Sequence, residues 1–266
     1  MIIDLHCHSD FSFDSDTAAE ELCRVAFQKK IGILSITDHC EFMKTKPIYR
    51  DYFDIESRII NENARLREKY AGRLTLLHGV EIGNPHNEPE LVKGLLCRGQ
   101  YDFVLGSLHF LEDDTDPYFL EYTPQNADGY LKRYFSQTEE MVDGGDFDCL
   151  GHIDYMLRFM QRDAELPKSY LPYSGQIVRI LEKLAVSGRA LEINLRPFES
   201  FGRLLLEPWV LKAFRDAGGK YITIGSDAHS AAQLANGYSA AVKMAAEAGF
   251  DALTIYKKRL PEFIPI

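Results

Sequence analysis

The sequence predicts an α/β fold in which seven parallel strands, each followed by a helix, close into a (β/α)7 barrel. Two observations predict this fold. Seven short apolar runs alternate with amphipathic segments, and alternating strands and helices imply a parallel sheet. Each run also ends in a side chain that can bind a metal ion or an anion, as is typical of the carboxyl ends of parallel strands. The chain of 266 residues fits one domain, residues 1–266, because such barrels commonly have about 250 residues.

The apolar runs are rich in Ile, Leu and Val, which predicts strands buried on both faces. They cover residues 2–6, 33–37, 74–80, 103–108, 147–151, 190–195 and 221–225. In an open sheet these strands would spread over roughly 30 Å, because neighbouring strands lie about 4.8 Å apart. Side chains on the first and last strands could then share no site, whereas a closed barrel brings them together.

The helices are expected between these runs. Residues 17–30 open with Thr17 and Glu20 in capping-box spacing. In residues 51–70 the apolar side chains follow one stripe, as an amphipathic helix requires. Gly188 and the pair Gly218–Gly219 favour helix ends. Further helices are expected at residues 126–143, 174–187, 207–217 and 231–248.

The predicted strand ends carry histidines, carboxylates and one arginine. In chain order they are His6 and His8, Asp38 and His39, Glu81, His109, His152 and Asp154, Arg196, and Asp227 and His229. Side chains two positions apart on a strand point the same way, so His6 and His8 should reach one side together, as should Asp227 and His229. One such residue alone is more often a hydrogen-bonding group, but their recurrence at six strand ends indicates a shared site.

Histidine and carboxylate ligands without cysteine suit Zn, Fe or Mn. The set contains more ligands than one ion takes, so two or three divalent ions that share a bridging carboxylate are expected. Glu81 is the expected bridge, because its strand offers no other ligand. Sites with two or more such ions are typical of enzymes that hydrolyse phosphate esters. His78 and His86 lie away from the strand ends and are expected to be structural or loop residues.

Composition and charge narrow the function. The net charge of −10 disfavours a nucleic-acid partner, although a few arginines and metal ions can still attract a small anion. The five cysteines form no C-x-x-C pair, which favours a reducing cytoplasm over a disulfide framework. The N-terminal residues do not resemble a signal peptide, and no apolar run is long enough for a membrane span. The sequence does not indicate an oligomeric state.

The motifs at the strand ends resemble the polymerase and histidinol phosphatase (PHP) superfamily over nearly the whole chain. They are DLHCHSDFSFDS (4–15), SITDH (35–39), GVEIG (79–83), GSLHF (106–110), GHIDY (151–155), LEINLR (191–196) and GSDAH (225–229). Within the superfamily the chain is similar to the monofunctional histidinol-phosphate phosphatases. Asp14 in the S-F-D motif, the G-S-L-H-F motif and E-I-N followed by Arg196 carry this finer resemblance.

The resemblance implies a distorted (β/α)7 barrel with a trinuclear metal centre. The first ion would be held by His6, His8, Glu81 and Asp227, the second by Glu81, His109 and His152, and the third by Asp14, His39 and His229. Asp10 and Asp16 lie beside Asp14 and are alternatives to it.

The implied reaction is the hydrolysis of L-histidinol phosphate to L-histidinol and phosphate, a step of histidine biosynthesis, by a hydroxide that bridges two ions. Arg196 and Arg158 are expected to bind the phosphate group. Asp154, Asp227 and His229 are the candidates for the general acid.

Asp4 and Asp38 are expected to orient histidines. Residues 41–53 could cover the organic part of the substrate or form a plain surface loop.

Three other functions compete with this one. The first is another PHP-type phosphoesterase with the same ligands, such as a nucleotide phosphodiesterase, a protein tyrosine phosphatase or a relative of the polymerase exonuclease module. The acidic charge disfavours a nucleic-acid substrate. An amidohydrolase-like barrel would typically use a carboxylated lysine or a lone aspartate, and no strand end offers a lysine. A metal-storage protein would not need two arginines beside its ligands.

Overall fold

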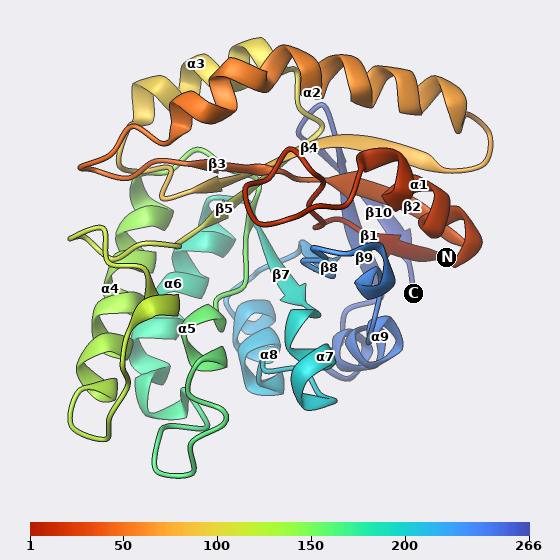
Figure 1. Ribbon diagram of the computed structural model, residues 1–266. Coiled ribbons are helices and arrows are strands. Elements are labelled where there is room, and N and C mark those ends of the chain that lie inside the picture. Colours follow the sequence, from red (N-terminus) through yellow and green to blue (C-terminus); the bar gives the residue numbers. More distant parts are fainter.

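The computed structural model describes all 266 residues and contains a central sheet of parallel strands (Figure 1). Its strands are β1 (Ile2–Asp4), β2 (Ile31–Ile36), β3 (His39–Glu41), β4 (Thr75–Gly83), β5 (Phe103–Ser107), β6 (Cys149–Leu150), β7 (Ala190–Asn194) and β8 (Ile222–Gly225). They pair in the order β1-β2-β4-β5-β6-β7-β8, and β3 pairs with the later part of β4. The seven predicted strands are therefore present, with β3 as a short extra strand directly after β2.

The barrel is nearly closed by main-chain hydrogen bonds between the segments that follow β1 and β8. Leu5 N donates to Ile224 O (2.9 Å), and His8 N donates to Ala228 O (2.8 Å). Asp227 N donates to His6 O (2.6 Å). The sheet thus brings the first and last strands together, and the predicted α/β barrel is confirmed.

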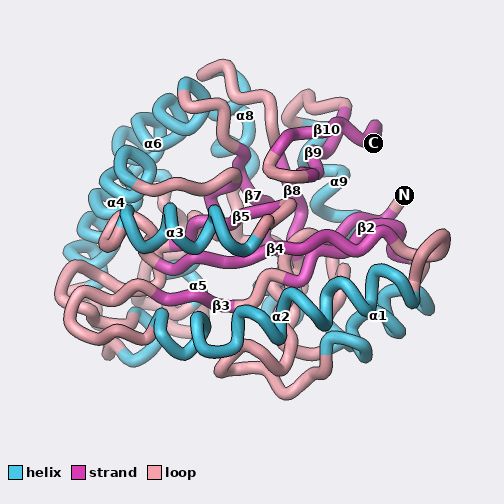
Figure 2. The backbone as a smooth tube through the Cα atoms, turned by 90° about the horizontal axis from the view of Figure 1, so that it is seen from above, coloured by secondary structure: helices cyan, strands magenta, loops and turns pink.

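Helices surround the barrel (Figure 2). They are α1 (Ala19–Gln28), α2 (Tyr49–Lys69), α3 (Pro89–Gly99), α4 (Ala127–Gly144), α6 (Ser174–Val186), α8 (Pro208–Asp216) and α9 (Tyr238–Glu247), with the short helices α5 (Tyr155–Arg158) and α7 (Arg196–Phe201) and three single 3₁₀ turns, η1 (Pro117–Phe119), η2 (Leu171–Tyr173) and η3 (Ala231–Gln233). No helix has the length and apolar character needed to cross a membrane.

Two helix predictions were wrong in detail. The expected helix 231–248 is split into η3 and α9, because Gly237 between them takes a left-handed conformation with φ of 89°. The Thr17–Glu20 capping box is also absent, since α1 has no side-chain cap. Thr17 instead donates its hydroxyl to the main-chain oxygen of His229 (3.3 Å), which ties the start of α1 to the segment after β8.

A C-terminal hairpin of β9 (Ala252–Lys257) and β10 (Leu260–Pro265) was not predicted. Its two turn residues, Lys258 and Arg259, both have positive φ, at 52° and 64°, but neither is the Gly or Asn that usually marks such a turn. Asp102 accepts the main-chain N–H of Lys258 (3.0 Å) and so stabilises the turn. Tyr256 stacks on Phe103 at the start of β5, so the hairpin lies at the amino ends of the strands, opposite the predicted site.

Candidate metal centre

Glu81 in β4 lies at the centre of the histidine cluster and is fully buried. Its Oε1 lies 3.2 Å from His109 Nε2 and 2.9 Å from His152 Nε2. Its Oε2 lies 3.2 Å from His6 Nε2 and 3.4 Å from His8 Nε2. One carboxylate therefore faces two different pairs of imidazoles with its two oxygens, which is the arrangement that a bridging ligand needs.

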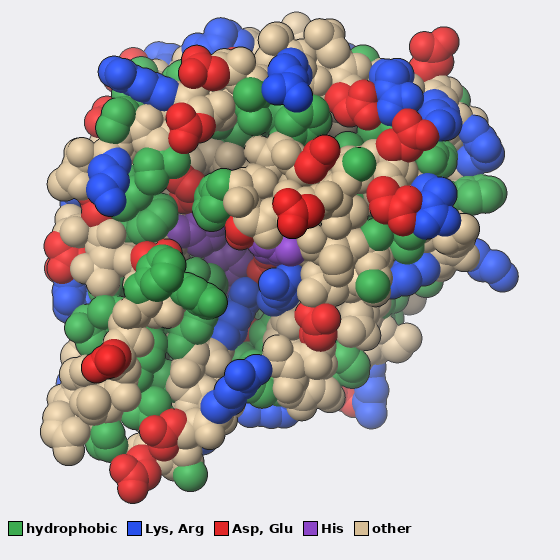
Figure 3. All heavy atoms as spheres, viewed as in Figure 1, with side chains coloured by type: hydrophobic (Ala, Val, Ile, Leu, Met, Phe, Trp, Pro, Cys, Tyr) green, Lys and Arg blue, Asp and Glu red, His purple; other side chains and the backbone are tan.

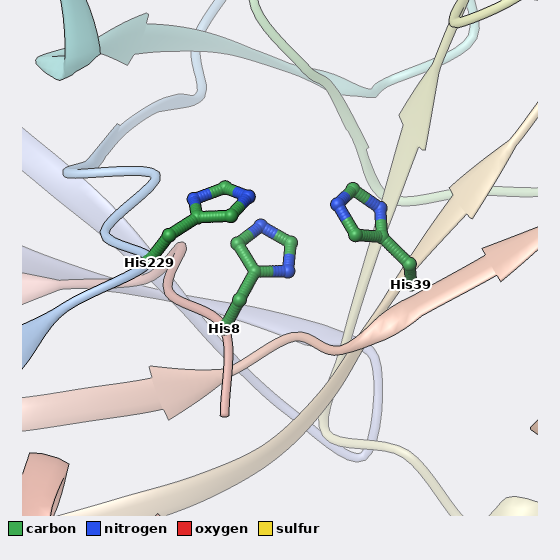
Figure 4. A group of neighbouring side chains, drawn as sticks. All are labelled: His8, His39 and His229. Carbon is green, nitrogen blue, oxygen red and sulfur yellow. The ribbon is translucent and has the colours of Figure 1, made fainter. Parts of the chain in front are cut away.

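A third group of ligand atoms lies beside this pair (Figure 4). His8, His39 and His229 come from three separate segments, and one ring nitrogen of each lies within 4.8 Å of the others. The ring of His8 lies 4.1 Å from that of His39 and 4.4 Å from that of His229, between ring centroids. Asp14 adds a carboxylate, with Oδ2 2.8 Å from His229 Nε2 and 3.6 Å from His39 Nε2.

Hydrogen bonds on the far side of the rings fix which nitrogen faces the cluster. His6 Nδ1 contacts Glu192 Oε1 (2.7 Å), and His109 Nδ1 contacts Glu41 Oε1 (2.8 Å). When each Nδ1–H donates to its carboxylate, the lone pair of Nε2 is left pointing inward. His229 Nδ1 lies between the main-chain oxygen of Asp227 (2.9 Å) and Arg196 Nη1 (3.1 Å), which turns Nε2 toward Asp14 Oδ2 (2.8 Å).

The donor atoms fit divalent cations. His6 Nε2 and His8 Nε2 face each other at 3.1 Å, and His109 Nε2 and His152 Nε2 do so at 3.4 Å. Glu81 Oε2, beside the first pair, is a buried oxygen without a hydrogen-bond partner. Facing lone pairs and an unpartnered carboxylate oxygen repel one another unless a cation lies among them. Imidazole and carboxylate donors without thiolates match Zn, Fe or Mn.

The electrostatics of the cluster also favour cations. Burial alone would raise the pKa of Glu81, but His6, His109 and His39 hold that pKa well below its usual range. Burial alone would lower the pKa of His109, yet the carboxylates of Glu41 and Glu81 raise it to about 10. These carboxylates create a negative potential that keeps protons on the imidazoles. The same potential stabilises metal ions when they replace those protons.

Asp227 joins the cluster through an unusual backbone conformation. It follows β8 with a φ of 53°, in the left-handed region that non-glycine residues seldom adopt. Its Oδ1 lies 3.8 Å from His6 Nε2 and 3.6 Å from His8 Nε2. The expected alternation along a strand therefore does not apply at Asp227 and His229, because β8 ends before them, but both side chains still reach the cluster.

A cavity of about 860 Å³ opens over the cluster, and histidine side chains are visible at its floor (Figure 3). Hydrophobic side chains and basic side chains lie on different margins of the opening in that view. The aromatic residues among its lining are Phe13, Phe110, Tyr118, Phe119, Tyr122, Tyr155, Phe159 and Phe201. The basic residues are Arg158, Arg162 and Arg196, and Asp116 is the one lining carboxylate outside the histidine cluster.

The predicted catalytic residues lie at different depths. Asp227 and His229 line the cavity, whereas Asp154 is buried and does not. Burial raises the pKa of Asp154, against the effect of the nearby Arg158 charge. Because a general acid must reach the leaving group, its position disfavours Asp154 for that role.

This chain matches a known protein family and several known proteins. A family model described as the PHP domain matches residues 4–196 of this chain. The chain belongs to the PHP domain family. Among curated PHP relatives, the "Probable histidinol-phosphatase" of Clostridium acetobutylicum is 29% identical over 268 residues, which cover 99% of this chain and all of that protein. The "Histidinol-phosphatase" of Lactococcus lactis is 25% identical and is matched over 86% of this chain and 84% of its own length.

Solved structures share the PHP fold. A histidinol phosphate phosphatase from Lactococcus lactis, crystallised with Zn, L-histidinol and phosphate, superposes with a TM-score of 0.80 at 22% identity and covers 98% of both chains. A putative histidinol phosphatase from Listeria monocytogenes gives a TM-score of 0.75 at 16% identity and covers 90% of this chain and 99% of its own. The barrel of this PHP family member is thus found in both proteins.

Two residues of this PHP site were missed in the sequence, and two were given the wrong role. Asp4 and Asp38 do not contact histidine rings: Asp4 accepts main-chain N–H groups of Ser226 and Ala235, and Asp38 accepts bonds from Ser9 and Ser12. Their carboxylates stabilise the loops that carry the histidines instead. Apart from the proposed ligands, the carboxylates that contact the rings are Glu41 and Glu192. The signals were present, because Glu41 is two residues from His39 and Glu192 is a charge inside an apolar run.

The structure places one of the three candidate aspartates at the cavity and places His78, His86 and most of residues 41–53 away from it. The structure brings Asp14, and not Asp10 or Asp16, to the cavity wall. His78 stacks on Tyr101, and neither it nor His86 belongs to the cluster. Of residues 41–53, only Glu41 lines the cavity, so this segment does not cover the substrate region. The aromatic wall comes mostly from residues 110–122 and 155–159 instead.

Proposed function

We propose that this PHP family member is a metal-dependent phosphomonoesterase that hydrolyses L-histidinol phosphate to L-histidinol and phosphate. One observation carries the proposal: a single cavity has a metal-binding cluster at its floor, arginines beside the cluster, and a carboxylate among aromatic rings elsewhere on its wall. L-Histidinol phosphate has a group for each of these: a phosphate for the cluster and the arginines, an ammonium group for the carboxylate, and an imidazole for the aromatic rings. The names of the relatives from Clostridium acetobutylicum and Lactococcus lactis support the same substrate.

The phosphate end would lie between the cluster and two arginines. Arg158 lies within the cavity wall, with Nη1 3.0 Å from Asp227 Oδ2. Arg196 begins α7 and donates from Nη1 to the main-chain oxygen of Asp227 (3.0 Å) and to Gln233 Oε1 (3.1 Å). Both guanidinium groups are thus held beside a proposed metal ligand, where a phosphate bound to the ions would meet them.

The organic end would lie against Asp116 and the aromatic side chains. Asp116 precedes η1 and accepts the main-chain N–H of Tyr118 (2.8 Å), which fixes its carboxylate at the wall. A carboxylate recognises the ammonium group of the substrate, and the rings of Tyr122 and Phe159, which stack at 6.3 Å, offer a flat apolar surface to an imidazole.

These positions suggest a role in the reaction for each group. When bound, the ions would activate water and offset the charge of the transition state. The proposed ligands are His6, His8, Asp14, His39, Glu81, His109, His152, Asp227 and His229. Arg158 and Arg196 would bind phosphate oxygens and orient the ester. Asp227 and His229, which line the cavity, are the candidates to protonate the leaving alkoxide.

We further propose that residues 1–266 act as one PHP-type barrel domain on a small substrate, without a nucleic-acid or membrane partner. The net charge of −10 supports a small ligand over nucleic acid. All five cysteines are free, four of them buried, which supports a reducing compartment such as the cytoplasm.

The test is phosphate release by the protein loaded with Zn, Fe or Mn. L-histidinol phosphate, a nucleotide phosphodiester and a phosphotyrosine peptide are compared by kcat/KM. A site that binds both the amine and the imidazole should prefer L-histidinol phosphate by a factor of about 100 or more. A higher kcat/KM for either of the other substrates would replace the proposal with a nucleotide phosphodiesterase or a protein tyrosine phosphatase.

A further inference from the structure

We propose that Glu41 is a positioning residue that joins two metal positions of the centre by contacting both His39 and His109. The inference rests on the proposed metal centre. It adds a residue that orients two of the nine proposed ligands without binding a metal ion itself. It does not depend on which phosphate ester the protein hydrolyses.

The geometry of Glu41 places it behind two imidazoles at once. Its Oε1 lies 2.8 Å from His109 Nδ1 and 3.0 Å from His39 Nδ1. The side chain is only 2% exposed, so the carboxylate is held away from bulk water. A single oxygen therefore contacts one histidine of the second proposed ion and one of the third.

The opposite nitrogens of these two rings face the ligand groups. His109 Nε2 lies 3.2 Å from Glu81 Oε1, and His39 Nε2 lies 3.6 Å from Asp14 Oδ2. At His109 the hydrogen bond to Glu41 selects the tautomer with its proton on Nδ1 and leaves Nε2 free to bind a metal. At His39 the contact with Glu41 is electrostatic and not a hydrogen bond, and Glu81 Oε2 lies 3.1 Å from the same nitrogen. Removing Glu41 would release both contacts.

The strand pairing reserves space for this carboxylate. In the parallel register of β3 and β4, His39 lies opposite Glu81 and Glu41 lies opposite Gly83. A Cβ atom added to Gly83 would overlap the Glu41 carboxylate, with Oε2 as the nearest atom. Gly83 does not have a positive φ, so the backbone conformation itself does not require glycine. The absence of a side chain at Gly83 therefore serves the placement of Glu41.

Zn²⁺ binding in the absence of substrate tests the inference. The metal-free protein and its Glu41→Gln and Glu41→Ala variants are titrated with Zn²⁺ against a chromophoric chelator, and bound metal is counted by mass spectrometry. Loss of a carboxylate that orients a ligand typically weakens metal binding about 10–100-fold. We expect a weakening of this size, larger for Ala than for Gln, with the full number of ions bound at saturating Zn²⁺.

Gly83→Ala provides a second test that removes no titratable group. Its methyl group would displace the Glu41 carboxylate, so we expect it to weaken Zn²⁺ binding as Glu41→Ala does. Glu56→Gln is the matched control, because Glu56 is also a buried glutamate, contacts Arg98 and lies on α2 away from the cluster. This control should bind Zn²⁺ as the unaltered protein does.

Two results would overturn the inference. Glu41 variants that bind Zn²⁺ as tightly as Glu56→Gln would show that Glu41 positions nothing. Loss of one ion from Glu41→Gln even at saturating Zn²⁺ would show that Glu41 is itself a ligand. Circular dichroism checks that each variant is folded. If Glu41→Ala does not fold, Gly83→Ala provides the test in its place. Failure to hydrolyse L-histidinol phosphate with normal Zn²⁺ binding would count against the proposed function alone.

Discussion

Arg158 donates a hydrogen bond from Nη1 to Oδ2 of Asp227 over 3.0 Å, while the other carboxylate oxygen of Asp227 faces His6 and His8. The second terminal nitrogen of Arg158 donates to Asn194 Oδ1 (2.9 Å). Only 11% of the Arg158 side chain is exposed. The arginine proposed for phosphate binding thus also orients a proposed metal ligand, and its removal should affect both tasks.

Replacing Arg158 with Ala should lower kcat/KM for L-histidinol phosphate about 10²–10³-fold, the usual cost of losing one preorganised donor to a developing negative charge. It should also weaken metal binding, because the Asp227 carboxylate loses the partner that orients it. Steady-state kinetics and metal analysis check both effects. Unchanged metal affinity would show that Arg158 serves the substrate only.

Replacing Arg196 with Ala should raise KM and lower kcat with metal content unchanged. Its Nη1 contacts the main-chain oxygen of Asp227, the side chain of Gln233 and Nδ1 of His229 (3.1 Å). None of these is an atom proposed to bind a metal ion, because His229 faces Asp14 with its other nitrogen, Nε2. Kinetics and metal analysis of the same sample give the answer. A variant that lost its metals would contradict the role of Arg196 in phosphate binding.

Replacing Glu81 with Gln should empty at least one metal position. The amide keeps one oxygen but cannot offer a charged oxygen to each of the two histidine pairs, and Ser107 already donates to Oε1 (2.6 Å). Metal counting by mass spectrometry at saturating metal is the measurement. Retention of every ion would exclude Glu81 as the bridge.

Replacing Asp116 with Asn should raise KM for L-histidinol phosphate about tenfold or more, because a charge-assisted hydrogen bond contributes about 1.5–3 kcal/mol. An aryl phosphate without an amine serves as the control substrate, and its KM should change little. Equal effects on the two substrates would place the amine elsewhere in the cavity.

Replacing His78 with Phe should make the protein less sensitive to acid. Burial lowers the pKa of His78 from 6.5 to about 4, so as the pH falls the unfolded chain takes up its proton first. Folding stability is then lost between pH 6.5 and pH 4, by about 2 kcal/mol from this residue at pH 5. Phe can keep the stacking on Tyr101 without this loss. Urea unfolding at several pH values between 6.5 and 4 measures the free energy of unfolding of both proteins. An equal loss of stability with falling pH in both would contradict the prediction.

The barrel could be predicted from the sequence because it depends on a repeated pattern. Buried parallel strands consist of continuous apolar runs, and their ends share one face of the sheet. The C-terminal hairpin could not be predicted in this way. Its turn at Lys258 and Arg259 lacks the usual residues and depends on a hydrogen bond from the main-chain N–H of Lys258 to Asp102, which is distant in the sequence.

The site could be predicted only in part for a similar reason. His6, Glu81 and Asp227 lie at predicted strand ends, where the recurrence of histidines and carboxylates from strand to strand suggests a shared metal site. The role of Glu41 depends on the register between β3 and β4 and on the space at Gly83, neither of which a single sequence specifies. The position of Asp154 behind the cavity wall depends on how α5 turns after β6.

The main-chain bonds that join the segments after β1 and β8 also bear on how this protein is made. His6 and Asp227 are bonded to each other through their backbones, although nearly the whole polypeptide separates them. Bringing such distant segments together carries a large cost in chain entropy and comes after local structure forms. A nascent chain that has not yet reached His229 therefore lacks two of the nine proposed ligands, Asp227 and His229, so the complete metal centre can form only after these residues have been synthesised.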